Sequence, residues 1–286
     1  MRFSRLGIFL LILSTVIIGA NCTYYNRIIA RKNLVDGGQA YANRNFKEAQ
    51  QLFRDAVERN PGSAEAKMAQ LFLARTLHSE YVANRQEPEK GEQAIEEYKN
   101  VLEINIADQS SFKAVANLLE NLGRQDEWLK WVTDRAANEQ VPPEQRAEAL
   151  TSLAAKQYSC ANNITDIDPV KKEVTKGTER VYQFTKPSDP AVYEELKQCI
   201  GAGTDLADRA VKLDPNSDSA WSYKANMLVQ QMRVAEMEGN MDQKEAFKAE
   251  ADQAKARFTE LADIKRKKVE EDERIKAEKE AAANKN

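Results

Sequence analysis

The chain has 286 residues, of which only 11 are glycine and 8 are proline, and 30% are charged. So few chain-breaking residues favour helices and exclude a large β-sandwich or β-barrel. Lys and Arg number 42 against 45 Asp and Glu, which leaves a net charge of -3 and no bulk attraction to nucleic acid, and a single histidine excludes catalysis that needs two.

The first predicted element is an uncharged apolar run over residues 6–20, preceded by Arg2 and Arg5. A basic segment followed by an apolar run is typical of an export signal. If the helix continues to Tyr25 it is about 30 Å long, the thickness of the hydrocarbon core of a membrane. Residues 1–26 are therefore predicted to be an export signal or a membrane anchor, with the rest of the chain outside the cytoplasm, in the periplasm of a bacterial envelope.

Cys22 follows this run directly, in the sequence Gly19-Ala20-Asn21-Cys22. The stretch resembles a bacterial lipobox, and the resemblance implies that Cys22 carries a lipid. Three alternatives stay open: an uncleaved transmembrane helix, a lipid anchor on Cys22, and a signal that is cleaved or a chain that stays in the cytoplasm. Positive charges on both sides of the run do not decide its orientation.

Two short stretches farther along the chain share one pattern of small, aromatic and proline residues. In such a helix-turn-helix unit a small residue lets two helices approach, an aromatic ring fills the gap, and proline ends the second helix. The first stretch contains Gly37, Phe46, Ala49, Phe53, Ala56 and Pro61, and the second runs from Ala210 through Pro215 to Trp221 and Ala225. Both stretches resemble tetratricopeptide repeats (TPRs), as in membrane-anchored or lipoprotein-like bacterial TPR proteins.

The resemblance implies an all-α solenoid of about five antiparallel helix pairs over residues 27–261. Beyond the pair in the first stretch, the pattern predicts helices at 64–82 and 92–104, 110–122 and 126–138, 144–158 and 191–213, and 221–237 and 242–261. An insertion at about 161–189 interrupts the pattern, and alternation around Thr175-Lys176-Gly177-Thr178 predicts a small β-hairpin there, with strands at 170–174 and 180–184. Residues 262–286 are predicted to be a charged tail, helical or disordered.

Cys160 and Cys199 flank the insertion. In an exported protein the two could form a disulfide, and the alternative is a pair of buried thiols.

No motif for a metal, a nucleotide or a catalytic nucleophile is present, so we predict no catalytic, cofactor-binding or metal site and no enzyme activity. The TPR resemblance instead implies a groove on the face of the first helices that binds a peptide or a partner helix. The residues expected in this groove are Tyr41, Met68, Phe72, Arg75, Lys113, Asn117 and Asn226. The alternative is that these side chains pack between repeats.

The sequence therefore predicts a non-catalytic scaffold, held at a bacterial membrane by its N-terminal segment, that binds other proteins or peptides and no nucleic acid. A lipidated assembly factor for outer-membrane or cell-wall machinery is an alternative, and an extracytoplasmic hydrolase is a weaker one.

Overall fold

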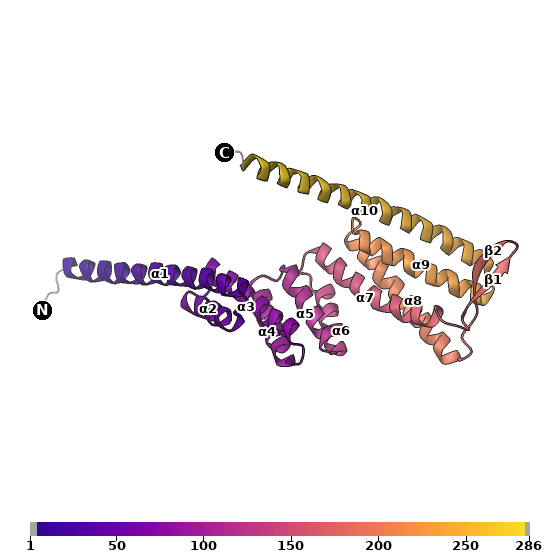
Figure 1. Ribbon diagram of the computed structural model, residues 1–286, viewed down its shortest axis with the longest axis horizontal. Coiled ribbons are helices and arrows are strands. Elements are labelled where there is room, and N and C mark those ends of the chain that lie inside the picture. The colour runs from indigo at the N-terminus through magenta and orange to yellow at the C-terminus, as the bar shows by residue number, and fades with distance from the viewer. Residues whose placement is uncertain (1–4, 284–286) are drawn as a thin grey trace. The chain divides into compact units, whose positions relative to one another are not determined.

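The computed structural model describes residues 5–283, without the side chains of residues 5–23, 176, 179 and 283. This part of the chain contains ten helices and one two-stranded sheet (Figure 1). The chain divides into two compact units, Met1–Trp128 and Leu129–Asn286, and the boundary falls inside the sixth helix. The boundary lies within the region that the sequence predicts as one solenoid.

The first unit is built from consecutive antiparallel helices. Its helices are α1 (Arg5–Ala42), α2 (Phe46–Arg59), α3 (Ala64–Ala83), α4 (Pro88–Ile104), α5 (Gln109–Asn121) and the start of α6 (Gln125–Ala137). Helix α1 packs against α2, α2 against α3, α3 against α4 and α4 against α5. A Cβ atom added to Gly37 would lie 2.7 Å from Cε1 of Phe53, which is fully buried. The predicted contact between a glycine of α1 and an aromatic ring of α2 is confirmed.

Polar side chains and prolines mark where the helices begin. The side chains of Ser63, Asp108 and Ser217 each accept a hydrogen bond from a backbone N–H of the first turn of α3, α5 and α9. Each bond satisfies a donor that has no partner within its own helix. Helices α4, α7 and α8 begin at a proline, where the missing N–H is not needed.

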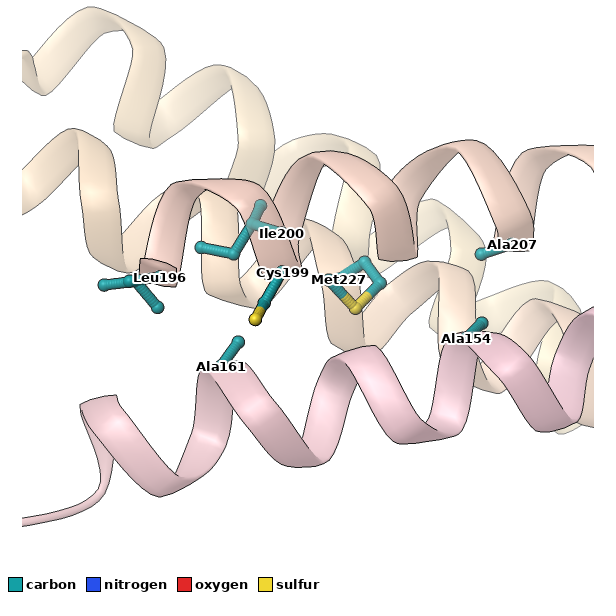
Figure 2. Close-up of a cluster of buried hydrophobic side chains, with 7 residues drawn as sticks. All are labelled: Ala154, Ala161, Leu196, Cys199, Ile200, Ala207 and Met227. Atoms are coloured by element: carbon teal, nitrogen blue, oxygen red, sulfur yellow. The ribbon is translucent and has the colours of Figure 1, made fainter. Parts of the chain in front are cut away.

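The second unit holds the remaining elements. These are α7 (Pro143–Thr165), β1 (Lys171–Lys176), β2 (Glu179–Phe184), α8 (Pro190–Leu213), α9 (Asp218–Glu238) and α10 (Met241–Ala283). Its core lies where α7, α8 and α9 meet, and Figure 2 shows Ala154 and Ala161 of α7 pointing toward α8. Small side chains on α7 let the two helices approach closely. Gly203 of α8 has the same role toward Met227 of α9, since an added Cβ would lie 2.6 Å from its Cε.

Cys160 and Cys199 form a disulfide between α7 and α8. Their Cα atoms lie 6.1 Å apart, within the usual range for a disulfide. Because α8 runs antiparallel to α7, Cys199 faces Cys160 although it lies more than two turns inside its helix.

The predicted β-hairpin is confirmed. Its two strands pair antiparallel, with Lys171 opposite Phe184, and Gly177 takes a φ of +65° in the turn, which an L side chain rarely adopts. The hairpin is fixed to α9 through Phe184, whose buried ring lies 4.7 Å from the guanidinium carbon of Arg233. Arg233 also donates a hydrogen bond to Thr165 Oγ1 at 2.8 Å, and burial lowers its pKa.

Helix α10 continues far beyond the predicted 242–261, so most of the predicted tail is helical in the structure. Its first half packs along α9 through Ala251 and Ala254. Most of the later residues are exposed, and ion pairs along the helix surface support it, such as that of Arg266 with Asp263 at 2.9 Å.

Of the predicted anchor, residues 1–4 lie outside the described part of the chain, and so do the side chains of residues 5–23, including that of Cys22. The side chains of Tyr24 and Tyr25 are exposed. Within the part of the chain that the structure describes, no helix is both long and apolar enough to cross a membrane.

Candidate functional site

The first unit contains a cavity of about 840 Å³. It lies between the end of α1, the start of α2, the C-terminal half of α3 and the middle of α4. Its lining residues are Tyr41, Ala42, Arg44, Phe46, Arg75, His78, Ser79, Val82, Ala83 and Tyr98. Four elements that meet in the fold therefore build one concave surface.

Aromatic rings form one wall of the cavity. The Tyr41 ring lies 6.0 Å from that of Phe46 and 6.4 Å from that of Phe72, measured between ring centroids. Phe72 in turn stacks on the fully buried Phe53, at 5.6 Å. Because the wall rests on the α1–α2 contact at Gly37, it is held by the core of the unit.

Neutral hydrogen-bonding groups lie beside this wall. The Tyr41 hydroxyl is hydrogen-bonded to Ser79 Oγ at 3.0 Å, and Nδ1 of His78 lies 3.3 Å from the Tyr98 hydroxyl. Burial raises the pKa of Tyr98 to about 12 and lowers the pKa of His78 below its ordinary value. Both side chains are therefore uncharged at neutral pH.

Arg44 and Arg75 give the cavity its charge. The Arg75 guanidinium carbon lies 5.6 Å from the centroid of Phe72. The described lining residues include no Asp or Glu. Glu80, one residue after Ser79, forms an ion pair with Lys90 at 3.2 Å and accepts a hydrogen bond from Gln50. The lining thus carries two positive charges without a carboxylate of its own.

The structure brings together some of the residues predicted for the groove. Tyr41 and Arg75 line the cavity, and Phe72 lies behind its aromatic wall. Met68 is 49% exposed on α3 and is not part of the lining.

The other predicted groove residues lie elsewhere. Lys113 and Asn117 are exposed on α5, where Asn117 accepts a hydrogen bond from Asn121 at 2.7 Å. Asn226 is part of α9 in the second unit. The lining of the cavity thus includes none of these three residues.

Several lining residues were missed by the sequence analysis. On α3 these are His78, Ser79 and Val82, which follow Arg75 at intervals of three, four and seven residues. That spacing places all four on one face of a helix, so the sequence held a signal for this wall. Arg44 and Tyr98 carried no such signal, because each reaches the cavity from a different element.

A second, smaller cavity of about 230 Å³ lies in the second unit, between α6, α7 and α8. Its lining includes Leu129, Leu150, Leu153 and Leu206, and Arg209 at its rim is paired with Asp205 at 3.2 Å. Within the described residues, no group of three or more His, Cys, Asp or Glu side chains is arranged to hold a metal ion.

Comparison with known proteins gave neither a matching family model nor a matching curated protein. Solved structures with a similar arrangement include MamA from Desulfovibrio magneticus RS-1, with 13% identity over 83% of this chain and 96% of that one and a TM-score of 0.34. PilF of Pseudomonas aeruginosa has 15% identity over 82% of this chain and 98% of that one, with a TM-score of 0.36. A tetratricopeptide repeat protein of Parabacteroides merdae has 12% identity over 85% and 93%, with a TM-score of 0.34.

The chain has a TPR-like fold, and this conclusion rests on its own antiparallel helix pairs and on the contact between Gly37 and Phe53.

Proposed function

We propose that this chain is a non-catalytic scaffold that binds a peptide segment of a partner protein in the cavity of the first unit, and that its N-terminal segment tethers it to a bacterial membrane. The observation that carries the proposal is the cavity itself, which combines an aromatic wall, neutral hydrogen-bonding groups and two arginines. Its volume is within the range of ligand-binding clefts.

The lining can contact both the side chains and the backbone of a peptide. Apolar side chains of a peptide would cover the rings of Tyr41 and Phe46 and the side chain of Val82, which is 54% exposed. Ser79 and Tyr98 would exchange hydrogen bonds with its backbone, which must keep its polar groups paired when it leaves water. A peptide in an extended or helical conformation would gain from both kinds of contact.

Two observations support the tether: basic residues precede an apolar run at the N-terminus, and α1 is continuous from there to the cavity. A single helix extends from Arg5 to Ala42, and Tyr41 in its last turn lines the cavity. Holding the cavity at a membrane would raise the effective concentration of partners at the same surface. The disulfide between Cys160 and Cys199 supports placement outside the cytoplasm, because disulfides persist in oxidising compartments.

The nature of the tether is a separate question, which Cys22 decides. If the anchor is a lipid, radiolabelled palmitate appears on the wild-type protein and is absent from Cys22→Ala. If it is an uncleaved helix, both proteins remain in the membrane fraction without label.

Site-specific photo-crosslinking in intact cells tests the binding role of the cavity. A photoreactive phenylalanine analogue replaces Val82 in the cavity or, as a control, Ile104, which is 48% exposed at the end of α4 and is not part of the lining. We expect a discrete crosslinked protein from position 82 and none from position 104, with mass spectrometry identifying the crosslinked segment. Equal crosslinking from both positions, or crosslinking from 104 alone, would remove the cavity as the binding site.

A further inference from the structure

The end of α1 has an arginine in a backbone conformation that favours glycine. Arg44 takes a φ of +61°. Its N–H donates to the carbonyl of Tyr41 at 3.0 Å, and the N–H of Asn45 donates to the carbonyl of Ala40 at 2.9 Å. These two bonds define a Schellman motif, in which the residue at the position of Arg44 is left-handed. A non-glycine side chain in that conformation is strained.

Two other helices of this chain end in the same motif. Gly123 after α5 and Gly239 after α9 have φ values of +71° and +76°, and each motif repeats both hydrogen bonds. Glycine thus occupies the left-handed position in two of these three motifs, and arginine occupies it in the third. The arginine stands against the local backbone preference, as residues at functional sites often do.

What Arg44 adds there is a charged side chain in the lining of the cavity. Arg75 supplies the second charge from α3, and neither arginine forms an ion pair among the described residues. Two carboxylates lie near the cavity without forming an ion pair with either arginine. Glu80 pairs with Lys90. Asp108 accepts hydrogen bonds from Ser110 Oγ and the Ser111 N–H as the cap of α5. Burial raises the pKa of Asp108, but these bonds and the charge of Arg75 lower it below its ordinary value.

We infer that the cavity binds an acidic peptide segment, in which Asp or Glu side chains pair with Arg44 and Arg75 and a neighbouring apolar side chain lies on the aromatic wall. This inference rests on the proposed function and names the chemistry of its partner. Two cations without a carboxylate in the same lining complement an anionic segment, and guanidinium groups bind carboxylates with two parallel hydrogen bonds. Lys113 and Asn117 have no part in this site.

Selection from a random library tests the chemistry of the partner. Heptapeptides are displayed between two folded modules, so that no free terminus is present, and are selected on the immobilised full-length protein. We expect the selected peptides to be enriched in Asp or Glu at two or more positions, beside an apolar residue. Selected peptides without acidic enrichment would overturn this inference and leave the scaffold proposal standing. A library from which no peptide is selected would contradict both.

Variants then separate binding from folding, with one selected acidic peptide as the fluorescent probe. Arg44→Gly should weaken binding by roughly fivefold, which corresponds to the upper end of the free energy of an exposed ion pair. Its melting temperature should stay the same or rise, by up to about 4 °C, because glycine relieves the left-handed backbone. Arg75→Gln, at a half-buried position, should weaken binding by roughly tenfold.

The matched control is Arg59→Gln, which removes an exposed arginine of α2 outside the lining and should leave affinity unchanged. Unchanged affinity of Arg44→Gly and Arg75→Gln would overturn the inference. An equal loss of affinity in Arg59→Gln would also overturn it, since binding would then depend on the net charge of the unit and not on the two arginines of the lining.

Discussion

Two adjacent glycines of α1 allow a sharp test of the helix pairing that supports the cavity. A Cβ atom at Gly37 would lie 2.7 and 2.9 Å from Cε1 and Cδ1 of Phe53, whereas a Cβ atom at Gly38 would meet nothing within 4 Å. Replacing glycine by alanine in the interior of a helix contributes about 1 kcal/mol of stability at either position. Overpacking a buried contact typically costs about 1–3 kcal/mol. We therefore expect Gly38→Ala to stabilise the first unit. The unfolding free energy of Gly37→Ala should be about 1–3 kcal/mol lower than that of Gly38→Ala.

Hydrogen exchange of the backbone amides of α2, measured by mass spectrometry on the full-length protein, gives the opening free energy of this part of the chain. Since 1.4 kcal/mol is a factor of ten, α2 should exchange roughly 5- to 150-fold faster in Gly37→Ala than in Gly38→Ala. Equal exchange in the two variants would show that Phe53 does not press on α1, and would refute the close approach of the two helices.

Replacing the ring of Phe53 tests whether the Cβ atom of Gly37→Ala clashes with this side chain. Phe53→Leu removes ring atoms that a Cβ at position 37 would meet, so it should destabilise Gly37→Ala less than it destabilises the wild type. A coupling free energy of about 0.5–3 kcal/mol is expected for residues in contact. Additive effects would place the cost of Gly37→Ala elsewhere.

Three further outcomes are expected. Replacing Cys160 and Cys199 by serine should destabilise α7 and α8 by about 4 kcal/mol in hydrogen exchange, because the bond spans 39 residues, and a loss below 1 kcal/mol would argue against a bond in solution. Ser63→Ala should lower the unfolding free energy of the first unit by about 1 kcal/mol in urea, since it removes the cap of α3, and no change would show that the cap is not formed. Burial holds the pKa of His78 below its ordinary 6.5, so the unfolded state binds the proton more tightly and the unfolding free energy should fall as the pH drops below about 6.5, a fall that His78→Gln should remove. The imidazole signal of this single histidine should titrate below 6.5 by NMR, and titration at or above that value would contradict its burial.

Much of the helical framework could be predicted from the sequence because it is set by local patterns. Gly37 and Phe53 lie at the spacing that lets one helix contact the ring of the next, and the structure places them in contact. The hairpin was predictable for the same reason, since alternating residues flank a turn in which Gly177 takes a positive φ. The length of α10 was not, because most residues after Leu261 are exposed and are supported by ion pairs, one of Lys265 with Asp218 of α9 and the others along the helix itself.

The candidate site was predicted only in part. Arg75, His78, Ser79 and Val82 share a helix face, but the sequence does not show which face is left open to solvent. That depends on how α1 ends, and the left-handed conformation of Arg44 could not be predicted because a glycine is expected there. Tyr98 reaches the cavity only because α4 packs back on α3, a contact set by the fold of the whole unit.

The peptide-binding role of the first unit is tested most directly by hydrogen exchange of the full-length protein with and without the segment that crosslinks at position 82. Bound segment should slow exchange at residues 41–46 and 75–83, which surround the cavity, and leave α5 and the second unit unchanged. Protection confined to α5 or to the second unit, with the cavity segments exchanging as before, would contradict the assignment.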